Sequence, residues 1–244
     1  MSQPLLSVND LSISFAGIKA VQHLSMEVEA GEIVGLIGPN GSGKSTTVNM
    51  ISGTYKPDSG EVYFDGRRLT NRDSIAERAK MGIGRTFQTP KPFENMSVYN
   101  NILAIGLLKY GFHEAHQKTL EILELSGLER QRNMPSGKLS IEKRKWLDLA
   151  RVLITDPKLI MMDEVMAGLN PNEMVESLEF VKEINRKGIT ILFIEHIMRA
   201  VVSICSRVVV LNEGKFLFGG TPLDALNNPD VIKAYIGGHE HAEH

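Results

Sequence analysis

The sequence EIVGLIGPNGSGKST, from Glu32 to Thr46, decides the fold of this chain. Its first part is almost wholly apolar, which is typical of a strand buried on both faces of a parallel sheet. The residues from Lys44 to about Gly53 are expected to form a helix. Between strand and helix lies a loop that fits the pattern Gly, any four residues, Gly-Lys-Ser. A strand, this loop and a helix in that order predict an α/β fold with a phosphate-binding site.

Backbone geometry and charge explain why such a loop holds a polyphosphate. Its glycines allow a tight curl in which successive N–H groups point at phosphate oxygens. The following helix adds roughly half a positive charge at its N-terminus. Lys44 can reach the β and γ phosphates, the Ser45 hydroxyl can ligate Mg²⁺, and Thr46 can contact the α phosphate side. The residues predicted to bind nucleotide here are Gly38, Pro39, Asn40, Gly41, Ser42, Gly43, Lys44, Ser45 and Thr46.

Two further apolar runs end in residues with catalytic chemistry. LIMMDE places Asp163 at the carboxyl end of a predicted strand, where open α/β sheets bind ligands, and Glu164 follows it directly. ILFIEH places His196 just past another strand, where it can sense the γ phosphate, and Gln88 lies in the loop RTFQT. We predict Asp163, Ser45 and Gln88 as Mg²⁺ ligands. We predict Glu164 as the general base, with His196 and Gln88 as its catalytic neighbours.

Composition limits the classes of function. The 244 residues carry a net charge of −2, so nothing global favours nucleic acid, and no nucleic-acid partner is expected. The single cysteine, Cys205, lies in the apolar context SICSRVVVL and is interpreted as a buried small hydrophobe in a reducing compartment. The N-terminus lacks the features of a signal peptide, and no apolar window approaches the ~20 residues that span a bilayer. Any role at a membrane therefore requires a partner.

The order of strand and helix patterns predicts how the chain is organised. LLSV, DLSISF, HLSMEVE and EVYFDG read as strands in the first third, and Met96 to Gly127 reads as helical. From Ser140 onward helices alternate with the strands LIMMD, ITILFIE and RVVVL, which implies a parallel sheet with covered faces.

We predict one domain over residues 1–238. Its core comprises 1–92 and 138–238, a helical insertion occupies 93–137, and a polar tail occupies 239–244. In that tail His239, His241 and His244 are expected to be solvated, with weak metal binding as the alternative.

These motifs in this order resemble the nucleotide-binding subunits of ABC transporters, and the resemblance covers essentially the whole chain. It implies a P-loop ATPase core with a mixed or parallel sheet, an N-terminal antiparallel β-subdomain and a helical subdomain. It matches Gly38–Thr46 to the Walker A loop and Gln88 to the Q-loop. It matches Asp163 and Glu164 to the Walker B aspartate and the catalytic glutamate, and His196 to the switch histidine.

The resemblance also concerns an aromatic residue near the N-terminus. Phe15, in SFAGIKAV, matches the aromatic side chain that stacks on adenine in that family. A Phe that faces the core from a strand is the other interpretation.

Three segments are similar to one branch of the family. GIGRTFQTPKPFENMSVYNNI, AGLNP and GTPLDALNNPDVIKAYIGG look like the ATPases of importers for branched-chain amino acids and related amides. This implies a MgATP-hydrolysing motor at the cytoplasmic face of the cell membrane. Its partners would be integral membrane permease subunits and, through them, a solute-binding protein. Two ATPase subunits, identical or different, would close head to tail around two ATP molecules.

The segment LSIEK, Leu139 to Lys143, departs from the family pattern Leu-Ser-Gly-Gly-Gln, which contacts the partner subunit's ATP. Ser140 is kept, and it is also a plausible N-cap of the following helix. Ile141 adds bulk where glycine would allow close approach. Glu142 either brings a negative charge toward the polyphosphate or points to solvent as an ordinary acid of the first helical turn. The first alternative predicts slow closure of the composite site.

Other functions stay open at this stage. The altered LSIEK segment suggests a nucleotide-binding regulatory or assembly module with impaired hydrolysis. An ATPase for lipopolysaccharide export has similar motifs. Soluble members of the superfamily in DNA repair or translation carry larger insertions, two cassettes or basic surfaces, none of which this sequence shows.

Overall fold

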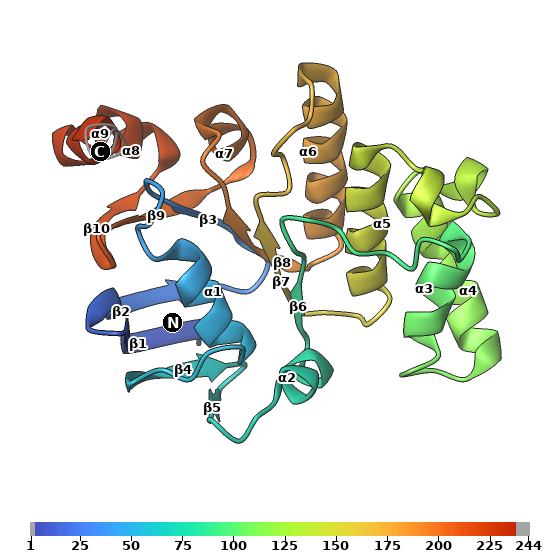
Figure 1. Ribbon diagram of the computed structural model, residues 1–244, viewed down its shortest axis with the longest axis horizontal. Helices are drawn as coiled ribbons and strands as arrows, with labels where there is room; N and C mark the ends of the chain where they lie inside the picture. Colours follow the sequence, from blue (N-terminus) through green and yellow to red (C-terminus); the bar gives the residue numbers. More distant parts are fainter. Residues whose placement is uncertain (1–2, 238–244) are drawn as a thin grey trace.

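A six-stranded sheet forms the centre of the molecule (Figure 1). The computed structural model describes residues 3–237, so His239, His241 and His244 of the predicted tail lie outside the described residues. The strands, in order across the sheet, are β10 (Lys215–Gly220), β9 (Arg207–Asn212), β3 (Ile33–Ile37), β8 (Thr190–Ile194), β7 (Leu159–Asp163) and β6 (Ile83–Arg85). β9 to β6 run parallel, and β10 is antiparallel to β9. The predicted sheet is confirmed as mixed, with one antiparallel edge.

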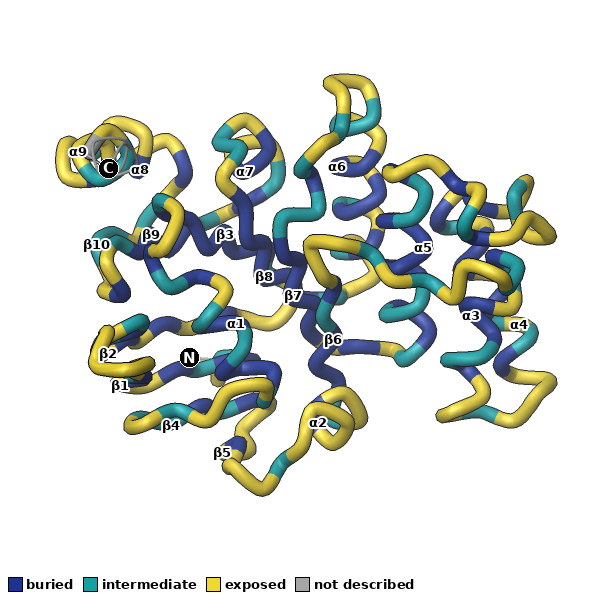
Figure 2. Tube along the Cα trace, viewed as in Figure 1, coloured by how far each residue is buried: buried dark blue, intermediate teal, exposed yellow. Residues whose placement is uncertain are grey.

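The central strands are apolar throughout because their residues alternate between two cores. In β7, Leu159 and Met161 belong to one apolar cluster, whereas Ile160 and Met162 belong to the cluster on the opposite face. Every residue of β3, β7 and β8 is buried (Figure 2). Burial on both faces explains the continuous apolar runs that predicted these strands.

A second, antiparallel sheet packs beside the first. Its order is β2 (Ile18–Val28), β1 (Leu6–Phe15), β4 (Ser59–Phe64) and β5 (Arg67–Leu69). The two predicted strands LLSV and DLSISF are in fact parts of the single strand β1, which continues through Asp10 at φ 54° with shifts of register. A local irregularity of this kind contains residues that are typical of turns, but the hydrogen bonds between the paired strands continue beyond it.

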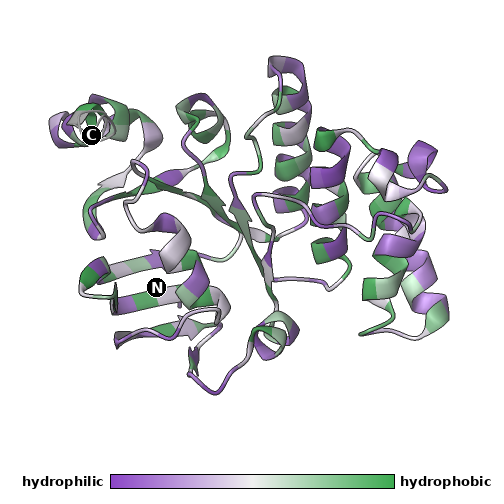
Figure 3. Cartoon of the chain, viewed as in Figure 1, coloured by the Kyte–Doolittle hydropathy of each residue, from purple (hydrophilic) through white to green (hydrophobic). Residues whose placement is uncertain are grey.

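Helices cover both faces of the central sheet. α1 (Lys44–Ser52) lies between the two sheets and shares its core with them. α5 (Ile141–Leu153), α6 (Pro171–Arg186) and α7 (Met198–Ile204) cover the other face, and α8 (Pro222–Asn227) and α9 (Pro229–Gly237) follow β10. Figure 3 shows hydrophobic residues along the central strands and hydrophilic residues spread over the outer helices. The sequence patterns predicted α1, α5, α6 and α7 to within a few residues.

The segment predicted as helical lies to one side of the core. It contains α3 (Val98–Gly106), α4 (Phe112–Leu125) and 3₁₀ turns at Glu129–Gln131 and Ser136–Lys138. α3 packs against α5, with Val98 and Ile102 in the same apolar cluster as Leu147. No helix of residues 3–237 is long and apolar enough to cross a bilayer.

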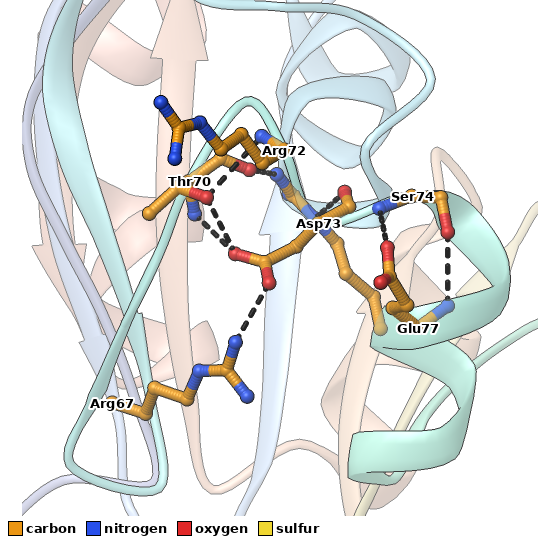
Figure 4. Close-up of polar contacts among 7 residues, drawn as sticks. Arg67, Thr70, Arg72, Asp73, Ser74 and Glu77 are labelled. Carbon is orange, nitrogen blue, oxygen red and sulfur yellow. Dashed lines mark hydrogen bonds and ion pairs between the residues drawn. The ribbon is translucent and has the colours of Figure 1, made fainter.

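α2 (Ile75–Met81) was not predicted, because it is short and has few buried apolar residues. Local hydrogen bonds hold its start. The Asp73 carboxylate accepts from the Thr70 N–H at 2.6 Å and from Arg67 at 2.7 Å, and Ser74 and Glu77 form a reciprocal capping box (Figure 4). These bonds, first those from Thr70, lower the pKa of Asp73. Polar capping thus replaces apolar burial as the stabilising interaction of α2.

Arg78 of α2 fixes the C-terminal end of α1. Its buried guanidinium donates to the carbonyls of Met50 and Ile51, both at 2.8 Å, and to the Thr70 carbonyl at 3.0 Å. The cation thus gives the Ile51 carbonyl at the helix end a partner and adds a second donor to the Met50 carbonyl, which also accepts from the Gly53 N–H at 3.2 Å. Since the other end of α1 begins in the phosphate-binding loop, Arg78 anchors the helix on which that loop is built.

Candidate active site

Two glycines make the conformation of the phosphate-binding loop possible. Gly38 has φ 146°, and a Cβ there would lie 2.1 Å from the Leu211 carbonyl oxygen. Gly43 has φ 100°, and its Cβ would lie 2.6 Å from the Ala20 carbonyl oxygen. Any other residue would clash with backbone at both positions. The predicted curl of the loop is therefore present and sterically specified.

Lys44 lies inside the curl. Its ammonium group donates to the carbonyls of Gly38 at 2.8 Å and Pro39 at 2.9 Å, and the side chain is buried. Burial lowers the Lys44 pKa, and the nearby carboxylates of Glu164 and Asp163 oppose that change. No side chain of the described structure caps the start of α1, so the first N–H groups of this helix are available to ligand oxygens.

The acidic end of β7 lies beside this loop because β8 alone separates β7 from β3 in the sheet. Asp163 is the last residue of β7, and its carboxylate pairs with Arg85 of β6 at 3.2 Å. The two side chains are 10% and 13% exposed. Arg85 also donates to Asn49 of α1 at 2.6 Å. One guanidinium thus joins the candidate metal ligand to the helix of the phosphate loop.

The three predicted catalytic residues lie together. The Gln88 amide donates to Glu164 Oε2 at 2.6 Å, and His196 Nδ1 lies 3.8 Å from Glu164 Oε1. Glu164 has φ 50°, a conformation that costs a non-glycine residue about 1–2 kcal/mol and recurs at functional sites. In this conformation its carboxylate contacts Gln88 and lies near His196.

Phe15 does not face the core. It is 42% exposed, which rules out the core-facing interpretation, and its ring meets the edge of the Tyr55 ring at a centroid distance of 5.2 Å. Tyr55 comes just after α1 and was not predicted, because a lone aromatic in a turn carries no pattern. The two rings form an accessible aromatic surface at the end of β1, suited to a planar base.

The start of α5 corrects one prediction about the LSIEK segment. Ser140 caps α5 by accepting from the Lys143 N–H, as expected, and Ile141 is 64% exposed. Glu142 is only 7% exposed, so the interpretation of it as a solvent-facing acid is wrong. Burial raises its pKa, and Lys143 opposes this, whereas Glu176 of α6 adds to it. The position of Glu142 around the axis of α5 directs its side chain toward α6. The sequence of the first turn alone does not show which neighbour a residue at that position meets.

The three predicted Mg²⁺ ligands suit this ion only together with oxygen ligands from elsewhere. Ser45, Asp163 and Gln88 offer hydroxyl, carboxylate and amide oxygens, which are hard ligands of the kind that Mg²⁺ takes. Within residues 3–237 no group of three or more His, Cys, Asp or Glu side chains could hold a metal alone. The residues therefore fit a metal ion that takes its remaining ligands from phosphate and water.

Comparison with known proteins identifies the family of this chain. The sequence profile of the ABC transporter family matches residues 21–167, from before the phosphate loop to just past Glu164. This chain belongs to the ABC transporter family. As a member of that family it is a nucleotide-binding ATPase.

Two curated relatives cover nearly the whole ABC cassette. LivG of Salmonella typhimurium, a high-affinity branched-chain amino acid transport ATP-binding protein, is 41% identical over 97% of this chain and 99% of LivG. LptB of Acidithiobacillus ferridurans, a lipopolysaccharide export system ATP-binding protein, is 33% identical over 96% of this chain and 97% of LptB.

Two solved structures share the fold of the cassette. One is the ADP conformation of an ATP-binding cassette of an ABC transporter, with a TM-score of 0.89, 34% identity and coverage of 97% and 100% of the two chains. The other is a dimeric post-hydrolysis state of an ATP-binding cassette bound to ADP and Pi. Its TM-score is 0.78 at 25% identity, and the match covers 89% of this chain and 98% of that one.

The structure adds residues of the ABC cassette that sequence patterns missed. Arg85, Lys145 and Glu195 are buried or nearly so, and each contacts a predicted site residue or its loop. Arg85 stands three residues before Gln88, and Glu195 directly before His196, which is the sequence signal that could have singled them out. Lys145 has no such signal, because a lysine in an amphipathic helix usually points to solvent.

Proposed function

We propose that this cassette hydrolyses MgATP to power an ABC importer for branched-chain amino acids or related amides. The observation that carries hydrolysis is the convergence of Gln88 and His196 on Glu164 beside the phosphate loop. The 41% identity to LivG over almost the whole of both chains supports the transport class.

The chain's own groups have distinct roles in this proposal. The loop amides, the start of α1 and Lys44 bind the phosphates, and the rings of Phe15 and Tyr55 hold adenine. Glu164 accepts a proton from the attacking water, while Gln88 donates a hydrogen bond that orients the carboxylate. The ring of His196, which lies beside Glu164, would contact the γ phosphate. Mg²⁺, held by Ser45, Asp163 and Gln88, would neutralise charge on the β and γ phosphates.

The proposed partners follow from the class of importer. Permease subunits in the membrane would bind this chain at the cytoplasmic face, and a solute-binding protein would act through them. A second ATPase subunit, identical or related, would supply the other half of each ATP site through its own Ser140 segment. The dimeric cassette similar to this chain supports such pairing.

A surface groove fits the permease contact. It has a volume of about 210 Å³ and lies between α2, β6 and α5, with Ile75, Phe87 and Val152 among its lining residues. Ile75 and Phe87 are exposed apolar side chains, and Phe87 directly precedes Gln88. A permease segment bound here would therefore contact the loop that carries a catalytic residue.

Lipopolysaccharide export is the second candidate for the transport class. LptB is similar along its whole length, but its identity of 33% is below the 41% of LivG. A regulatory module without turnover fits less well, because Glu164 keeps both of its polar neighbours.

Co-purification and transport measurements test the proposal. The tagged chain is purified from membranes together with the integral membrane proteins that accompany it, and the complex is reconstituted into liposomes with its solute-binding protein. ATP hydrolysis and uptake of labelled leucine or an aliphatic amide should both require Mg²⁺ and the solute-binding protein. Glu164→Gln should bind ATP without turnover, and Lys44→Ala should lose binding. Recovery of no integral membrane protein, or transport of lipid instead of amino acid, overturns the importer assignment.

A further inference from the structure

We propose that Lys145 and Glu195 are positioning residues that hold the loop carrying Glu164 and connect it to the start of α5. The inference rests on the proposed role of Glu164 as general base. It concerns two buried ionisable side chains that lie behind the catalytic carboxylate and touch no predicted ligand.

Lys145 reaches the loop from α5. Its ammonium group donates to the Val165 carbonyl at 3.0 Å and also to the Ala167 carbonyl. The side chain is buried, and burial lowers its pKa, while the carboxylates of Glu195 and Glu164 oppose that change. A buried cation with two carbonyl partners is costly to displace, because removing it leaves those carbonyls unsatisfied.

Glu195 reaches the same loop from the end of β8. It is fully buried, and its Oε1 accepts from the Met166 N–H at 2.8 Å. Its Oε2 has no hydrogen-bond partner among the described residues. Two peptide groups of the loop are thus held. The one that joins Val165 to Met166 is bound at its carbonyl by Lys145 and at its N–H by Glu195, and the one that follows Ala167 is bound at its carbonyl by Lys145.

The loop needs such support because Glu164 adopts a strained conformation. Its φ of 50° is less favourable than the strand or helix regions, so surrounding contacts must maintain it. Its N–H donates to the Ile194 carbonyl at 2.9 Å, which fixes one side of the bend. The contacts of Lys145 and Glu195 fix the residues on the other side. Without them the backbone can relax and the carboxylate turns away from Gln88.

Lys145 also connects the position of this loop to the position of α5. The helix begins at Ile141, only four residues before Lys145, and Ser140 caps it. In the proposed dimer this helix start faces the partner subunit's nucleotide. A shift of α5 on dimer closure would therefore move the ammonium group and the backbone beside Glu164. Closure on the partner subunit's nucleotide would in this way orient the general base of the subunit that contributes α5.

Substitutions that remove or keep the hydrogen bonds test the inference. In the reconstituted transporter we expect Lys145→Met, which keeps the apolar stem, to lower kcat for ATP at least tenfold with KM within twofold. Lys145→Arg, which can still donate, should recover most of the rate. Glu195→Leu should resemble Lys145→Met, whereas Glu195→Gln keeps an acceptor for Met166 and should stay near wild type. The double variant Lys145→Met/Glu195→Leu should lose little more than either single variant, since both act on one loop.

Hydrogen exchange gives a readout independent of activity. The Met166 amide should be protected in the wild-type cassette and should exchange at least tenfold faster in Lys145→Met and Glu195→Leu. Lys182→Met and Glu183→Gln, which remove ion-paired side chains from the surface of α6, serve as matched controls. They should change neither kcat for ATP nor the exchange rate of the Met166 amide.

Several results would overturn the inference. They are kcat within twofold of wild type in both disruptive variants, a parallel loss of ATP affinity, or unchanged Met166 protection despite a lost rate. If the disruptive variants do not fold, an unprotected Met166 amide in the wild type refutes the proposal, and a protected one supports it. A wild-type protein without ATPase activity would refute the proposed function instead, leaving the exchange result to be judged separately.

Discussion

At the scale of single residues, the acidic end of β7 depends on Arg85. The Asp163 carboxylate is nearly buried, and the Arg85 guanidinium at 3.2 Å is its cationic partner. Burial raises the Asp163 pKa above its ordinary value, and Arg85 counteracts this. A native acid with a raised pKa binds a proton that the unfolded chain has lost, so its contribution to stability falls as pH rises through that interval.

Arg85→Met should therefore destabilise the protein in a pH-dependent way. Removing one partner of a buried ion pair costs about 3–5 kcal/mol. Because the Asp163 pKa would rise further, the difference in unfolding free energy from wild type should be larger at pH 8 than at pH 5. Urea denaturation at both pH values measures it. An equal loss at the two pH values would show that Asp163 does not respond to Arg85.

Cys205 offers a second test at this scale, because it is the only cysteine of the chain. The thiol is buried as predicted, and burial raises its pKa to about 12. The thiolate is the reactive form, so at pH 8 a shift from about 8.5 to this value lowers its fraction roughly a thousandfold. A thiol-reactive dye should label the native protein about a thousand times more slowly than the unfolded chain. Fast labelling in native buffer would contradict this burial.

At the scale of elements, the two ends of α1 differ in how they are bound. Its N-terminus carries no side-chain cap and faces the phosphate loop, whereas its C-terminal carbonyls accept from the buried Arg78. The helix is thus anchored at the end away from the ligand, which leaves its positive end free for phosphate.

Arg78→Met should lower stability by about 1–3 kcal/mol, because it removes donors from the carbonyls at the end of α1 and leaves that of Ile51 without a partner among the described residues. Urea denaturation gives the loss, and the nucleotide affinity of the folded variant should fall as the helix loses its anchor. Arg72→Met, at an exposed position of the loop before α2, is the matched control and should stay within about 0.5 kcal/mol of wild type. Equal stability of the two variants would contradict the anchoring role.

The start of α5 carries the other prediction at this scale. Ile141 projects into solvent where a partner would approach, while Glu142 is buried toward α6. We expect replacement of Ile141, Glu142 and Lys143 by Gly-Gly-Gln to raise the steady-state ATPase rate of the reconstituted transporter a few-fold, on the order of 1 kcal/mol in barrier. Most of the gain should appear already in Ile141→Gly, since bulk at the surface is what this substitution removes. An unchanged rate would show that the altered segment does not limit closure.

At the scale of the whole molecule, the order of strands in the sheet assembles the site. β3, β8 and β7 are neighbours, so the phosphate loop, Glu195 with His196, and Asp163 with Glu164 emerge at one edge although the sequence separates them widely. The boundaries at 93 and 137 of the helical insertion stay a prediction. α5 packs against α3 of that insertion and against the core, and it therefore couples the two parts.

In the proposed function each chain supplies only half of an ATP site, so two chains should form a dimer only when nucleotide is bound. Glu164→Gln keeps the binding groups but lacks the base, so with MgATP it should accumulate as a dimer of twice the 27.0 kDa chain mass. Light scattering coupled to gel filtration measures that mass. Lys44→Ala should remain a monomer under the same conditions. A monomeric Glu164→Gln protein that binds ATP would show that a different subunit is the obligatory partner.

The sequence by itself determined the phosphate loop, the central strands and the choice of Glu164, Gln88 and His196, which the fold brings together and which we propose as catalytic. These depend on local patterns: glycines at fixed spacing, apolar runs of strand length, and polar residues directly after them. Tertiary structure alone decided the burial of Glu142, the continuity of β1 and the contacts of Arg85, Arg78, Lys145 and Glu195. A buried charge is stable only beside partners that are distant along the chain, so no local pattern marks it before the fold brings those partners together.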